Sequence, residues 1–175
     1  MPKIIGEVKE RILQSAKQKI LEKGYKALSL RSVATECGIA VGTIYNYFGS
    51  KDDLIAAVME EDWNKALKQM DENCQSAKDI REGFMGIYES IHDFCNIYKS
   101  VWYQYSSPKA FNVASERHSH LLNQICERIL FLLKRFDYEK DIEIAPLLAE
   151  MLLSVVMRSE MNFHQMDVII QRIFQ

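Results

Sequence analysis

The sequence predicts an all-α protein in which a small N-terminal group of helices precedes a larger helical body. Apolar residues recur every three or four positions along most of the chain, as on one face of a helix, and no segment reads as a convincing strand. Five of the seven glycines lie before residue 50, so the body has few built-in helix breaks. With 175 residues, the chain can bury a core and form one large domain or two small ones.

The first two helices follow from apolar spacing and from capping residues. One apolar stripe predicts a first helix over about residues 7–23. Ser29 is a favourable N-cap for a second helix, which ends at Gly38, where a left-handed residue commonly terminates a helix. The first stripe consists of Val8, Ile12, Ala16 and Ile20, and the second of Leu30, Val33, Ala34 and Cys37.

A third helix buries Val41, Ile44 and Phe48, which are spaced i, i+3 and i+7. Gly42 then points outward, although glycine costs a helix about 1 kcal/mol relative to alanine. Close approach of the backbone to a partner would offset that cost. The motif over about residues 29–48, two short helices joined by a tight turn, is the shape that places side chains in the major groove of DNA. The exposed side of its second helix carries Gly42, Thr43, Tyr45, Asn46 and Tyr47.

These exposed side chains have the chemistry for reading DNA. Asn46 can bond bidentately to adenine, and Thr43 can contact a thymine methyl group or donate a hydrogen bond. Ser50 is expected to cap a long fourth helix from about Lys51 to Met70. Lys51 lies in the first turn, where the helix dipole disfavours a cation. A DNA phosphate at this helix N-terminus would make the lysine favourable.

Residues from about Glu7 to Leu67 resemble the DNA-binding domain of the tetracycline-repressor (TetR) family of bacterial transcription regulators. The resemblance implies that Thr43, Tyr45, Tyr47 and Lys51 lie at the DNA and that Ser29 contacts the DNA backbone. Ala40 departs from the family's frequent serine, which weakens the cap of the third helix, so position 40 is not included. The matching residues are the run from Ile20 to Tyr25, then Ser29, Leu30, Val33, Ala34, Gly38, Ile39, the run from Val41 to Tyr45, Tyr47, Phe48, Lys51 and Leu54. The predicted DNA-binding residues are Ser29, Gly42, Thr43, Tyr45, Asn46, Tyr47 and Lys51.

The resemblance implies a three-helix helix-turn-helix DNA-binding domain over residues 5–65 and a helical effector-binding and dimerisation domain over residues 66–175. The function expected from it is a homodimeric repressor that binds a palindromic operator in double-stranded DNA through residues 41–48. A small apolar or aromatic effector would release it. The alternative is a DNA-binding regulator whose body senses a protein partner instead of a small molecule.

In the body, helices are expected over about residues 78–98, 115–135, 143–158 and 161–175, with a short piece before Pro108. Pro146 must lie in a first helical turn, because proline has no backbone N–H to donate. Aromatic residues concentrate between Phe84 and Phe111. They form either an effector pocket or ordinary core, and family resemblance favours the pocket. The candidate ligand-binding residues are Tyr88, His92, Tyr98, Trp102, Tyr103 and Tyr105.

The last two helices carry more apolar residues than one face of an ordinary surface helix holds. Two such helices from each of two chains would close a two-fold four-helix bundle, whose symmetry matches a palindromic operator. Alternatively, these faces pack only against the chain's own body. The predicted dimer-interface residues are Leu148, Met151, Leu152, Val155, Ile169, Ile170 and Ile173.

Charge and composition limit the other function classes. Residues 1–51 carry nine Lys or Arg and four Asp or Glu, and the rest of the chain is acidic, which suits a DNA-binding head on a body that stays off DNA. No nucleophile–base set or phosphate-binding glycine loop is evident, so the protein is not expected to be an enzyme or to need a cofactor. His92 and Cys95 do not make a metal site by themselves. The four cysteines show no paired short spacing, and no segment spans a membrane, which predicts reduced thiols in a cytoplasmic protein.

Overall fold

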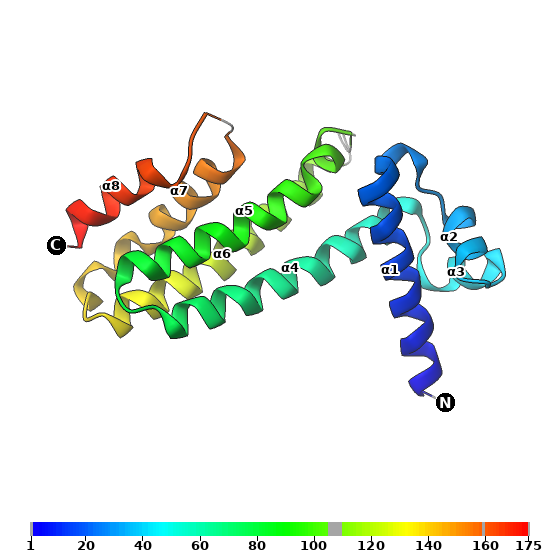
Figure 1. Cartoon of the computed structure of the whole chain (residues 1–175), viewed down its shortest axis with the longest axis horizontal. Helices are drawn as coiled ribbons and strands as arrows, with labels where there is room; N and C mark the ends of the chain where they lie inside the picture. The colour runs from blue at the N-terminus through cyan, green and yellow to red at the C-terminus, as the bar shows by residue number, and fades with distance from the viewer. Residues whose placement is uncertain (1, 105–109, 159, 175) are drawn as a thin grey trace. The chain divides into compact units, whose positions relative to one another are not determined.

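The structure is a computed structural model that describes residues 2–104, 110–158 and 160–174. Helices and short connections make up all of this described part, and no strand occurs in it (Figure 1). The predicted all-α class is therefore confirmed. The helices are α1 (Pro2–Ala27), α2 (Leu30–Glu36), α3 (Val41–Tyr47), α4 (Lys51–Ser76), α5 (Ile80–Gln104), α6 (Ala110–Arg135), the 3₁₀ helix η1 (Glu139–Ile144), α7 (Ala145–Met157) and α8 (Phe163–Ile173).

Several boundaries differ from the expected ones. Helix α1 is longer than expected at both ends, and its path is interrupted at Gly24, where φ is 74°. Helix α6 begins five residues earlier than expected, and the 3₁₀ helix η1 was not expected. Pro146 lies in the first turn of α7, as its chemistry requires. Helix α5 runs on to Gln104, through part of the stretch where a separate short piece was expected before Pro108, and residues 105–109 lie outside the described part.

Packing divides the chain into two compact units. The first contains the chain up to Asn64 together with the end of α5 from Ile97, and the second contains the remainder. Because α4 changes unit after Asn64 and α5 changes at Ile97, each of these helices contributes to both units. The sequence did not predict that the end of α5 belongs to the N-terminal unit.

The N-terminal unit has its own apolar core. Most side chains that α1, α2, α3 and α4 carry at helical spacing on the predicted inner faces are buried, whereas Val8 and Val41, also expected there, are half-buried. Ser29 Oγ accepts a hydrogen bond from Ser32 N (3.1 Å), and Ser50 Oγ accepts one from Asp53 N (3.1 Å), so both predicted caps are present. The fully buried core residues are Ile12, Ala16, Val33, Ala34, Ile44 and Leu54.

The second unit is held together by close helix packing. Helix α7 packs against α6, η1 and α8. On α5, a β-carbon added at Gly86 would lie 2.6 Å from Cβ of Asn73 on α4, so only glycine allows this approach. The Asn73 amide donates to the Gly86 carbonyl across the contact (3.1 Å). Within the described part of the chain, no helix is both long and apolar enough to cross a bilayer.

Candidate nucleic-acid interface

The turn between α2 and α3 has the geometry of a compact helix-turn-helix motif. Gly38 adopts φ 64°, which L-residues with a side chain rarely do, and ends α2 as expected. The Ile39 amide then donates back to the Ala34 carbonyl (3.0 Å), which closes the turn. Ala40 provides no side-chain cap for α3. The missing serine therefore leaves α3 held by packing of Ile44, which is fully buried.

Helix α3 separates its residues into a buried side and an exposed side. Phe48 is buried behind Ile44, while Gly42, Tyr45 and Asn46 are exposed and Thr43 and Tyr47 are half-buried. The structure thus brings five of the seven predicted DNA-binding residues together on one short helix. A β-carbon at Gly42 would meet nothing within 4 Å, so the chain's own packing does not require glycine at this position.

Helix α1 is the scaffold that fixes α2. The Arg11 guanidinium donates to the Cys37 carbonyl at the end of α2 (2.7 Å), and Lys19 pairs with Glu36. The hydrogen bond from Lys19 lowers the pKa of Glu36. Two cations of the basic N-terminal region therefore hold the motif together, which leaves fewer of them for attracting DNA than the simple charge count indicates.

The other two predicted contact residues lie at helix starts. Ser29 is exposed, and its hydroxyl caps α2. Lys51 is the first residue of α4 and is half-buried, with its ammonium 3.9 Å from the centre of the Tyr25 ring. Burial lowers the pKa of Lys51, an effect that the neighbouring Asp52 opposes. Because amides at a helix start and a nearby cation both attract anions, this corner is suited to a DNA phosphate.

A buried polar cluster in the same unit was missed by sequence reasoning. Asp62 on α4 is only 7% exposed, and it accepts a hydrogen bond from the Tyr98 hydroxyl of α5 (2.6 Å). Lys17 on α1 forms an ion pair with the same carboxylate (2.7 Å). The cluster therefore joins three helices at one acid. The three residues are far apart in sequence, and no local pattern signals that they meet.

The predicted ligand-binding residues that the structure describes belong to both compact units. The Tyr88 ring stacks on His92 (centroids 5.5 Å apart) and packs against Phe163 of α8 (5.2 Å). Tyr98 belongs to the other unit, where it is fully buried in the core and its hydroxyl donates to Asp62. The side chains of Trp102, Tyr103 and Tyr105 lie outside the described part of the structure.

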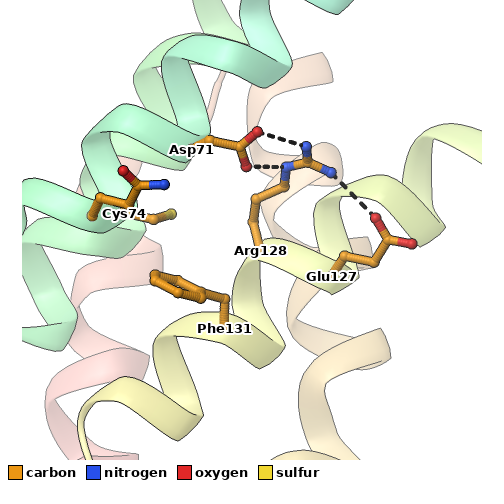
Figure 2. A pocket seen from close by; sticks show the side chains of 6 residues that line it. Asp71, Cys74, Glu127, Arg128 and Phe131 are labelled. Carbon is orange, nitrogen blue, oxygen red and sulfur yellow. Dashed lines mark hydrogen bonds and ion pairs between the residues drawn. The ribbon is translucent and has the colours of Figure 1, made fainter.

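Two hollows occur in the second unit, and neither contains a predicted ligand-binding residue. One, of about 200 Å³, lies between α4 and α6 beside Phe131, which is 44% exposed (Figure 2). Arg128 lines this hollow and forms ion pairs with Asp71 (Nε to Oδ1, 2.9 Å) and with Glu127 (3.3 Å). The other, of about 310 Å³, lies where α5 begins and α8 ends, and Lys78, Arg81, Phe136, Tyr138, Gln171 and Phe174 line it among others.

The predicted dimer-interface residues fall into two groups. Four of them are core of the chain's own body, each no more than 4% exposed, because α7 packs against α6 and α8: Leu148, Leu152, Val155 and Ile170. These four residues therefore pack within the chain's own body, as the alternative expectation has it, and the dimer interface itself stays a prediction. Met151 and Ile169 are half-buried, and Ile173 is 39% exposed. Leu147 of α7, which was not included, is 61% exposed.

Residues with metal-binding chemistry are scattered in the described part of the chain, where no three of them come together. His92 interacts with Asn96 (3.1 Å) and Asp93 (3.7 Å). All four cysteines are unpaired thiols. Burial raises the pKa of Cys74 and of Cys95 to about 12, which keeps both protonated and unreactive at neutral pH.

Comparison with known proteins connects this geometry to one family. Residues 12–58 match the family described as bacterial regulatory proteins, tetR family. The HTH-type transcriptional regulator UidR of Escherichia coli (strain K12) is 36% identical over 62 residues, which are 35% of this chain and 32% of UidR. This chain thus spans about a third of the length of that curated relative.

Two solved structures share the whole fold at low sequence identity. The transcriptional regulator FadR from Bacillus subtilis in complex with stearoyl-CoA has a TM-score of 0.66 and 18% identity, over 91% of this chain and 88% of FadR. A regulator from Saccharomonospora viridis in complex with choline has a TM-score of 0.60 and 19% identity, over 95% of each chain. These findings show a match to the tetR family over residues 12–58 and, for the chain as a whole, a fold shared with the two solved structures.

Proposed function

We propose that the protein is a DNA-binding transcription repressor of the cytoplasm that inserts α3 into the major groove. The observation that carries the proposal is the exposed side of α3, where Gly42, Tyr45 and Asn46 face solvent on a motif held rigid by α1. A helix fixed in this way can meet a groove without a large ordering cost. The match of residues 12–58 to the tetR family of bacterial regulatory proteins supports the same function.

The roles of the contact residues follow from their chemistry and placement. Asn46 and Thr43 read base edges, since amide and hydroxyl groups match the hydrogen-bonding pattern of the major groove. Tyr45, Tyr47 and Lys51 hold phosphates, and Ser29 contacts the DNA backbone at the start of α2. Gly42 lets the backbone of α3 approach the groove.

The test compares two substitutions on an operator selected from random DNA. Asn46→Ala should cost about 1–3 kcal/mol on that operator and relax its sequence preference. Lys51→Ala should weaken binding to all sequences and reduce the slope of log K against log salt by about one unit. Asn96→Ala, which truncates an exposed asparagine of α5, is the control and should bind as wild type. Unchanged operator preference in Asn46→Ala would contradict the assignment of α3.

The protein acts as a homodimer on a palindromic site. The surface that supports this is the outer apolar face of α7 and α8, formed by Leu147 (61% exposed), Met151, Ile169 and Ile173 (39% exposed). Exposed apolar residues gathered on adjacent helices mark an interaction surface. Leu147→Glu and Ile173→Glu should dissociate the dimer in sedimentation experiments, because each buries an unpaired charge. Leu21→Glu replaces an equally exposed leucine of α1 and should stay dimeric, and dimers in all three variants would refute this interface.

A small apolar or aromatic effector releases the repressor from DNA. The resemblance in fold to structures with stearoyl-CoA and with choline makes these two compounds reasonable first probes. Each is titrated by tryptophan fluorescence, with and without operator. Because coupling between two binding sites is reciprocal, an effector must bind more weakly when operator is present. Equal affinity in both conditions would exclude that compound as an inducer, and a protein partner that dissociates the complex would favour the alternative in which the body senses a protein.

A further inference from the structure

Tyr25 occupies a position between the end of α1 and the start of α4. Gly24, with φ 74° and ψ 173°, interrupts the helical path immediately before it, so Tyr25 leaves the direction of α1. Its ring faces the ammonium of Lys51 at 3.9 Å. Its hydroxyl donates to Oδ1 of Asp52 at 3.0 Å. One aromatic side chain therefore contacts both of the first two charged residues of α4.

The two contacts act on opposite charges. The face of an aromatic ring carries a negative electrostatic potential that attracts a cation, so the Tyr25 ring restrains the Lys51 ammonium. The hydroxyl holds Asp52, whose carboxylate would otherwise be free to pair with the neighbouring lysine or to repel a phosphate. The half-buried ammonium has already lost part of its water shell, and this burial lowers the pKa of Lys51. A phosphate that reaches this corner therefore meets a cation that has less water to lose and fewer rotamers to restrict than a fully exposed lysine.

We propose that Tyr25 is a positioning residue for DNA binding, which orients Lys51 toward the phosphate backbone and keeps Asp52 away from it. This inference rests on the proposed phosphate contact of Lys51. Tyr25 itself need not touch DNA, because its effect passes through the lysine. The hydroxyl and the ring have separable roles, since phenylalanine keeps the ring alone and leucine keeps neither.

The experiment uses the full-length protein and a fluorescein-labelled DNA duplex of random sequence, titrated at several salt concentrations. Tyr25→Leu should weaken binding several-fold and reduce the salt slope toward that of Lys51→Ala, which is about 0.9 below wild type. Tyr25→Phe should keep the wild-type slope. In the Lys51→Ala background, Tyr25→Leu should weaken binding no more than Tyr25→Phe does, because only the release of Asp52 then remains.

A second measurement reports the geometry directly. Ring currents from Tyr25 should displace the NMR signals of the Lys51 ε-methylene protons upfield in wild type and in Tyr25→Phe, and Tyr25→Leu should abolish the displacement. If Tyr25→Leu lowers the thermal stability, Tyr25→Trp restores a ring face and should recover both the binding and the displaced signal.

The outcomes separate this inference from the proposed function. Unchanged binding in Lys51→Ala would refute the phosphate contact itself, and with it any positioning role of Tyr25. Weakened binding in Lys51→Ala with wild-type binding in Tyr25→Leu would refute positioning alone. Equal losses from Tyr25→Leu with and without Lys51 would also refute it, because the tyrosine would then act independently of the lysine.

Discussion

At the scale of single residues, Gly42 stands out because open space surrounds it on an exposed helix. Alanine fits there without a contact and has the higher helix propensity. We therefore expect Gly42→Ala to raise the free energy of unfolding by up to about 1 kcal/mol, as measured by urea denaturation. The same substitution should weaken DNA binding in fluorescence anisotropy, since the added methyl group faces the groove.

Gly38→Ala is the matched comparison for Gly42→Ala. Its backbone has φ 64°, where a side chain is strained, so alanine at this position should lower the free energy of unfolding. If Gly42→Ala is more stable and binds DNA as well as wild type, close backbone approach is not the reason for glycine on α3.

At the scale of helices, an ion pair fastens α8 to the start of α5. Arg81 donates to both carboxylate oxygens of buried Asp167, and the second bond measures 2.9 Å. The hydrogen bonds from Arg81 lower the pKa of Asp167 below its ordinary value. Because an acid with a lowered pKa stabilises the fold above its unfolded pKa, this contribution is complete at neutral pH. It is lost as the pH falls through the lowered, folded value.

The prediction concerns the difference in stability between wild type and Arg81→Met. Urea denaturation should give a constant difference from pH 7 down to about pH 5, and the difference should shrink below about pH 4, where the unfolded carboxyl protonates. Arg172→Met, which removes an exposed arginine of α8, is the control and should leave the stability nearly unchanged at every pH. A difference that stays constant to pH 2 would show that Arg81 acts through packing and not through its charge.

The helices also show which parts of the fold are readable from sequence. The limits and faces of α2 and α3 were predicted because caps and apolar spacing are local signals, and the motif that places Asn46 outside follows from them. Leu147 and Leu152 lie on the same apolar helix, yet one is exposed and the other fully buried. Which side of α7 the body covers depends on α6 and α8, and no local pattern carries that information.

The candidate site also contains one part that the sequence predicts and another part that it does not. The exposed residues of α3 were predictable from their spacing, and the chemistry of Asn46 and Thr43 from their side chains. The bond from Arg11 to the Cys37 carbonyl spans 26 positions, and the bond from Tyr98 to Asp62 spans 36. Long-range pairs such as these depend on the tertiary arrangement, so a single sequence does not disclose them.

At the scale of the whole molecule, the Asp62 cluster connects residues of α1, α4 and α5 that are far apart in the sequence. Tyr98→Phe removes the hydroxyl that donates to a buried carboxylate and leaves Lys17 as a remaining partner. We expect a loss of about 1–3 kcal/mol in the free energy of unfolding, measured by urea denaturation. Tyr88→Phe removes a hydroxyl from the same helix at a half-buried position and should have a much smaller effect. If both substitutions lower the free energy of unfolding equally, the hydrogen bond from Tyr98 to Asp62 makes no stabilising contribution of its own.

The end of α5 makes the N-terminal unit discontinuous in sequence. Tyr98 and Val101 are fully buried in that unit, although the family match ends forty residues earlier, at residue 58. A fragment cut after Asn64 would lack both side chains and would open their contacts to water. We therefore expect such a fragment to melt well below the intact protein in circular dichroism. Any chimaera that grafts the N-terminal unit onto another helical body would have to carry the end of α5 with it.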